Sequence, residues 1–83
     1  MNHNESVEDY LETILILSEE KPVVRSVDIA NETGFSKPSI SIAVKNMKAK
    51  NYITVSDEGY ITLSESGRDI AERVYERHKF LRK

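Results

Sequence analysis

Residues 28–47 read DIANETGFSKPSISIAVKNM, in which a small residue, a glycine and an aliphatic residue follow one another at restrictive spacings. Ala30 allows a second helix to approach closely, and Gly34 can adopt the left-handed conformation of a tight turn. Ile40 then packs the second helix onto the first. The segment therefore predicts two helices joined by a short turn, and it constrains the fold more than any other part of the chain.

Capping residues predict where these two helices begin and end. Ser26 is expected to cap a helix from residue 27 to about residue 33, and Ser36 to cap a helix that begins one residue later. Pro38 falls in the first turn, where a backbone N–H has no helical partner. The buried side of this later helix is expected to consist of Ile40, Ala43, Val44 and Met47.

Other elements are expected on both sides of the pair. Residues 6–20 have the apolar spacing of an amphipathic helix with Ser6 as its N-cap, and residues 23–25 are expected to form a very short strand. Residues 52–55 and 60–63 are β-prone and flank the turn sequence SDEG. A last helix runs from Glu65 to about Arg82 behind the cap Ser64, with Ile70, Val74 and Leu81 on one face and Ala71, Arg77 and His78 beside it.

The order α-α-α-β-β-α is that of a winged helix-turn-helix, a mainly α fold with a small β-hairpin. The 83 residues are expected to form one domain, residues 1–83. So short a chain buries a modest core, and we expect a homodimer. The end of the last helix is expected to contribute to the dimer contact through Phe80 and Leu81. Ile16 of the first helix is expected to join them there. The chain has no cysteine and no apolar run of membrane-spanning length, so we expect a cytoplasmic protein.

Charge is distributed unevenly along the chain, although the net charge is only -2. Residues 1–20 contain six acids and no lysine or arginine, whereas residues 37–50 contain four lysines and no acid. A helix-turn-helix aims the start of its second helix into the DNA major groove, where serines and lysines reach base edges and phosphates. Ile42 suits a thymine methyl group. The expected contacts are Ser36, Lys37, Ser39, Ser41, Ile42, Lys45, Lys48 and Lys50. The acidic turn at residues 56–59 is expected to contribute little.

Three stretches, SVEDYLETI, VRSVDIANETGFSKPSISIAVKNMKAKNYI and GYITLSESGRDIAERVYERHKFL, resemble the iron- and manganese-dependent repressors of the diphtheria toxin repressor and manganese transport regulator family. The resemblance covers residues 6–81 and concerns the N-terminal DNA-binding part of that family. It implies a homodimer that binds a palindromic operator in double-stranded DNA when loaded with Fe(II) or Mn(II), and represses metal-uptake genes. It also places Ser36, Pro38 and Ile42 near base edges.

The same resemblance implies a metal site. Asp9, Glu12 and His78 match ligands of the manganese-type members, and His3 is a further candidate. Asp9 and Glu12 stand at i and i+3, on one side of a helix, and carboxylate with imidazole suits Mn(II) or Fe(II). In the family a second domain supplies more ligands, so the three residues are expected to form a partial site. The chain is expected to be either a stand-alone relative or the DNA-binding half of a longer protein.

Simpler interpretations of these residues remain open. Asp9 can be a capping acid, Glu12 a solvated charge, and His78 a half-buried histidine paired with an acid. A winged helix can also serve as a protein-interaction module, or as an anti-repressor that pairs with a full-length homologue. Enzymatic activity is not expected, because the sequence shows no serine, histidine and acid arrangement and no glycine-rich phosphate loop.

Overall fold

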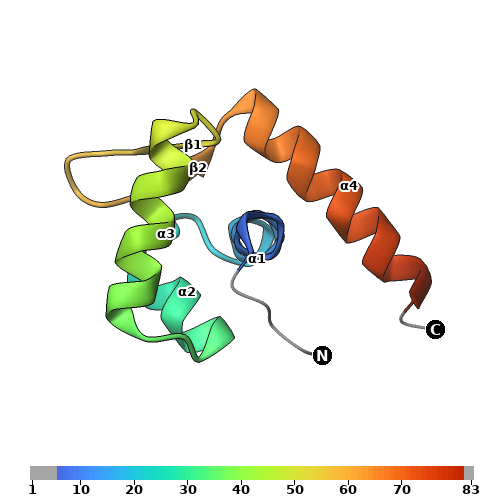
Figure 1. Ribbon diagram of the computed structural model, residues 1–83, viewed down its shortest axis with the longest axis horizontal. Coiled ribbons are helices and arrows are strands. Elements are labelled where there is room, and N and C mark those ends of the chain that lie inside the picture. Colours follow the sequence, from blue (N-terminus) through green and yellow to red (C-terminus); the bar gives the residue numbers. More distant parts are fainter. Residues whose placement is uncertain (1–5, 82–83) are drawn as a thin grey trace.

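The computed structural model describes residues 6–81, and the side chains of residues 6–79. The helices are α1 (Val7–Glu20), α2 (Ser26–Thr33), α3 (Lys37–Ala49) and α4 (Glu65–Leu81), and the strands are β1 (Ile53–Val55) and β2 (Ile61–Leu63). In Figure 1, α1 is seen end-on, with α2, α3 and the hairpin on one side and α4 on the other. The predicted order of elements and the winged helix-turn-helix fold are confirmed.

A single apolar core lies around α1. Leu11 and Ile14 of α1 are fully buried, as are Ile29 of α2 and Met47 of α3. Ile40 is also buried, whereas Ala43 and Val44 pack half-buried against the core. Because α1 contacts every other helix, its orientation positions both α3 and α4. No helix within residues 6–81 combines the length and the apolar character needed to cross a bilayer.

The turn between α2 and α3 forms as predicted. Gly34 ends α2 with a φ of 78°, a left-handed conformation that glycine adopts without steric penalty. The Ser36 hydroxyl accepts a hydrogen bond from the Ser39 backbone N–H (3.3 Å) and so caps α3. Pro38 lies in the first turn of that helix.

Two predictions between α1 and α2 are wrong. The N-cap of α2 is Arg25 and not Ser26, since the Asp28 carboxylate reaches back to accept from the Arg25 backbone N–H (2.9 Å). Residues 23–25 form no strand. The Ile61 backbone N–H donates to the Val24 carbonyl (2.7 Å), but this single bond does not extend into a ladder.

The hairpin, here called the wing, pairs β1 and β2 antiparallel, with Ile53 opposite Leu63 and Val55 opposite Ile61. Each strand is one residue shorter than predicted. The turn at residues 56–59 closes with Gly59 at a φ of 85°, a left-handed conformation at the position where the sequence places glycine.

Helix α4 begins where the wing ends. The Ser64 hydroxyl accepts from the Gly67 backbone N–H (3.1 Å) and donates to the Asn51 carbonyl (2.6 Å). Val74 is buried as predicted. Ala71, which was expected at the edge of the buried face, is fully buried, and Ile70, which was expected within that face, is only half-buried. The small side chain of Ala71 lets α4 approach the core. The spacing of large apolar residues alone does not predict that so small a residue is buried. Leu81 and Phe80 lie outside the described side chains, as does Arg82, and Ile16 is half-buried.

Candidate nucleic-acid interface and metal-ligand cluster

The N-terminal half of α3 presents a polar, exposed surface. Lys37, Pro38 and Ser41 are exposed, and Ser39 is half-buried, with its hydroxyl accepting from the Ser36 hydroxyl (3.0 Å). Ile42 is 62% exposed, an unusual environment for a large aliphatic side chain. The residues predicted for this surface therefore do lie together on one side of α3, directed away from the core.

Lysines on and after α3 remain available to a partner. Lys45, Lys48 and Lys50 are exposed, and within residues 6–79 none of the α3 lysines lies within 4.0 Å of a carboxylate. An exposed cation without an ion pair can neutralise a phosphate without first breaking an internal contact. This surface, defined by Ser36, Lys37, Pro38, Ser39, Ser41, Ile42, Lys45, Lys48 and Lys50, is called the α3 surface below.

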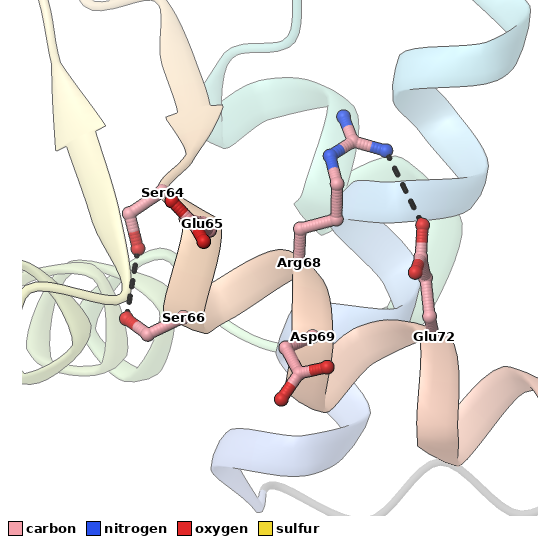
Figure 2. A pocket seen from close by; sticks show the side chains of 6 residues that line it. All are labelled: Ser64, Glu65, Ser66, Arg68, Asp69 and Glu72. Atoms are coloured by element: carbon pink, nitrogen blue, oxygen red, sulfur yellow. Dashed lines mark hydrogen bonds and ion pairs between the residues drawn. The ribbon is translucent and has the colours of Figure 1, made fainter.

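A hollow at the start of α4 has the opposite charge character. Figure 2 shows an open hollow at the start of α4, lined by Ser64, Ser66, Arg68 and three acids, Glu65, Asp69 and Glu72. Its single arginine pairs with Glu72 (3.8 Å), and Asp69 pairs with Arg73 (2.7 Å). The hollow carries a net negative charge and repels phosphate, which leaves the α3 surface as the side suited to a polyanion.

The predicted metal ligands come together from opposite ends of the chain. Asp9 and Glu12 project from α1, and His78 projects from α4, which packs against it. Their ligand atoms all lie within 4.8 Å of one another. His3 lies outside the described residues.

Glu12 is the central residue of this cluster. It is 2% exposed, so the interpretation as a solvated charge is wrong. Its two carboxylate oxygens lie 2.9 Å and 3.0 Å from Nδ1 of His78, whose side chain is 27% exposed. A buried carboxylate requires a partner, and the imidazole provides one. The half-buried Asp9 accepts from the Ser6 hydroxyl (3.0 Å), so its role at the helix start is present as well.

These donors fit a divalent ion of the Mn(II) or Fe(II) class. Two carboxylates and one imidazole give the oxygen and nitrogen donors that such ions accept, and the cluster is already assembled by the packing of α1 on α4. Asp9, Glu12 and His78 would fill three positions of an octahedral ion and leave the others to water or to further ligands.

A contact between the start of α2 and the wing was not predicted from the sequence. The Arg25 guanidinium lies over the Tyr60 ring, 4.8 Å from its centroid, and donates to the Tyr60 hydroxyl (3.1 Å). The residues are 35 positions apart, and the pairing exists only because the chain before α2 runs beside β2.

The pKa of the Asp28 carboxyl is lowered, and the cause lies at the start of α2. The Arg25 backbone N–H, which donates to the carboxylate, is the main cause that holds the pKa of Asp28 below its ordinary 3.8. Lys21, at 3.2 Å, acts in the same direction, and burial opposes both.

Replacing Asp28 by alanine is expected to lower the free energy of unfolding by about 1 kcal/mol at neutral pH, because the cap of α2 is lost. The folded-state pKa is the lower one, so this contribution is present above pH 3.8 and is lost as the pH falls through the folded-state pKa. Urea unfolding followed by circular dichroism at neutral and acidic pH measures the change. Glu32→Ala, which removes an exposed acid of the same helix, is the control. A difference that stays constant with pH would contradict the assignment.

The fold is similar to that of solved structures, among them SloR and MepR. The manganese regulator SloR superposes with a TM-score of 0.76 at 28% identity, over 94% of this chain and 35% of that one. MepR, a transcription regulator of the Staphylococcus aureus multidrug efflux pump MepA, superposes with a TM-score of 0.65 at 21% identity, over 87% of this chain and 57% of that one, and shows likeness of fold alone. The fold defines a winged-helix domain of the class found in transcription regulators.

Sequence comparison gives the family. Residues 3–61 match the family described as iron dependent repressor, N-terminal DNA binding domain. The transcriptional regulators MntR of Geobacillus kaustophilus (strain HTA426) and Geobacillus thermodenitrificans (strain NG80-2) are 34% and 33% identical over 76 residues, which are 92% of this chain. The chain belongs to the iron-dependent repressor family and forms its N-terminal DNA-binding domain. It spans about half (54%) of the length of these two relatives.

Proposed function

We propose that this domain binds a palindromic operator in duplex DNA as a homodimer and represses transcription in the cytoplasm, with no catalytic activity of its own. The observation that carries the proposal is the α3 surface, an exposed face with unpaired lysines and no acid. Family membership supports it. Two copies are included because a helix-turn-helix gains affinity and specificity by reading two half-sites.

Each part of the α3 surface has its own role in the proposal. Lys45, Lys48 and Lys50 contact phosphates, which gives affinity but no sequence preference. Ile42 contacts a thymine methyl group, which offsets the unfavourable exposure of its side chain. The hydroxyls of Ser36, Ser39 and Ser41 bind base edges or phosphates, and Pro38 fixes how the start of α3 enters the groove.

Metal control is the second part of the proposal. Asp9, Glu12 and His78 would hold Mn(II) or Fe(II), which would supply positive charge between two carboxylates and tie α1 to α4. Because α1 also packs on α3 and α2, a change in its position is transmitted to the α3 surface. The likeness to SloR, a manganese regulator, supports this class of ion.

Selection from a random-sequence duplex library, with and without Mn(II), tests the proposal. The selected duplex is then titrated by fluorescence anisotropy at several salt concentrations, and sedimentation of the complex counts its subunits. We expect enrichment of a palindrome, two subunits on each duplex and a steep fall of affinity with salt. No salt-dependent binding to any duplex, together with capture of a protein partner, would favour an interaction module instead.

Two substitutions on α3 separate affinity from sequence preference. Lys45→Ala is expected to weaken binding about fivefold on selected and scrambled duplexes alike, and to reduce the salt slope by about 0.9, because one phosphate contact is lost. Ile42→Ala is expected to weaken the selected duplex by about 1 kcal/mol while leaving the scrambled one unchanged. Anisotropy titrations of both variants on both duplexes measure this. An Ile42 effect of equal size on both duplexes would contradict base contact.

A further inference from the structure

The wing of this domain is poorly suited to approach DNA with its tip. Residues 56–59 include Asp57 and Glu58, both exposed, and no lysine or arginine. In Figure 1 the turn of the wing nevertheless projects past α3 on the side away from α1, where a duplex on the α3 surface would lie. A cation is therefore needed beside the wing if the wing is to approach a phosphate backbone.

Arg25 is placed to supply that cation. Its guanidinium stacks on Tyr60, the residue that begins the return from the wing turn, and donates to the Tyr60 hydroxyl (3.1 Å). The adjacent backbones are joined as well, because the Ile61 N–H donates to the Val24 carbonyl (2.7 Å). Stacking on an aromatic ring orients the planar guanidinium and leaves other N–H groups of its fork free for a second partner.

The Arg25 guanidinium makes no close ion pair within residues 6–79, although its charge contributes at longer range to the lowered pKa of Asp28. Asp28, the acid closest in sequence, accepts from the Arg25 backbone N–H and pairs with the Lys21 ammonium (3.2 Å). Across residues 6–79, no carboxylate lies within 4.0 Å of the Arg25 guanidinium. Arg25 is exposed, so this cation is both oriented and unpaired.

Arg25 also lies on the same side as the α3 surface. The next two residues, Ser26 and Val27, line a groove together with Lys37 and Ser41 of α3. A duplex seated on the first half of α3 therefore passes the start of α2 as well, where Arg25 directly precedes this groove and stacks on Tyr60 of the wing.

We propose that Arg25, positioned by Tyr60, contacts a backbone phosphate of the duplex and replaces the acidic wing tip as the wing-side DNA contact. The proposal rests on the proposed DNA-binding function. Arg25 contributes affinity for any sequence, because a phosphate carries no base identity. Tyr60 acts as a positioning residue that holds the guanidinium in place.

Anisotropy titration of the full chain tests this with the selected duplex and a scrambled duplex of equal length. Arg25→Ala is expected to weaken both about tenfold and to reduce the salt slope by about 0.9. Arg73→Ala is the matched control, because it removes one arginine from α4, outside the α3 surface, and should leave affinity and slope unchanged. Circular dichroism confirms that each variant folds.

A double-mutant cycle tests the role of Tyr60. Tyr60→Leu is expected to weaken binding about threefold when Arg25 is present and to have no effect when position 25 is alanine. Equal affinity and slope for Arg25→Ala and the unsubstituted chain would overturn the inference alone. Failure of the unsubstituted chain to bind either duplex would overturn both the inference and the proposed function. An Arg25→Ala effect confined to the selected duplex would also overturn the inference, since it would indicate base contact.

Discussion

Gly67→Ala is expected to lower the free energy of unfolding by about 3 kcal/mol, at the upper end of the range for overpacking a tight contact. A Cβ atom at Gly67 would fall deep inside the van der Waals envelope of the Tyr52 carbonyl oxygen. That carbonyl is backbone, and it is fixed by a hydrogen bond from the Ser64 N–H (2.9 Å). The start of α4 would have to move away from the wing. Urea unfolding followed by circular dichroism measures the change.

The expected loss of stability is opposite in direction to the usual effect of this substitution in a helix. In an ordinary helix, replacing glycine by alanine stabilises the fold by about 0.5–1 kcal/mol. Glu65→Ala, at an exposed position of the same first turn, is the control and should change stability by no more than about 0.5 kcal/mol. Stability of Gly67→Ala equal to or above that of the unsubstituted chain would show that α4 does not approach Tyr52 so closely.

Glu12→Gln is expected to reduce the affinity for Mn(II) by at least about 100-fold. Loss of a residue that only supports a ligand already reduces metal affinity by about 10–100-fold, and Glu12 is itself a proposed ligand at the centre of the cluster. The substitution preserves side-chain shape but removes the negative charge that faces His78 and Asp9. Isothermal titration calorimetry with Mn(II) measures the affinity, and Asp9→Ala should weaken it in the same direction.

Glu8→Gln provides the matched control for metal binding. Glu8 lies on the same helix, is exposed, and within residues 6–79 makes only a distant ion pair, with Arg77 (4.0 Å). Its substitution should leave the Mn(II) affinity within about threefold of the unsubstituted chain, since an exposed pair contributes little. Negligible heats for all of these proteins would remove the metal part of the proposal and leave DNA binding untouched.

Much of the fold follows from local sequence signals because its boundaries use local chemistry. Gly34, Ser36 and Pro38 act through their own backbone positions, so the turn and the start of α3 were predictable. The errors have two causes, a competing local contact and packing between distant segments. Asp28 reaches back to cap α2 from within, and Ala71 is buried because α4 packs closely on the core.

The candidate site shows the same division. The exposed residues of α3 follow from helical spacing, and the resemblance to the family supplied the three metal ligands. Spacing could not show that Glu12 is buried or that its carboxylate contacts His78. Arg25 and Tyr60 were missed because they stand 35 positions apart and their contact depends on how the wing folds back. Gly67 was missed because glycine in a helix start gives no indication of what its missing side chain would strike.

The contact between Glu12 and His78 joins residues 66 positions apart and so encloses the helix pair and the wing within one loop. Contacts of such long sequence separation form only after much chain entropy has been lost. A nascent chain that has not yet reached α4 lacks His78, and with it the cluster. If the proposed metal binding holds, the ion would be sensed only by chains in which α4 has formed, and it would add RT ln(1 + [L]/Kd) to the stability of this fold without assisting its precursors.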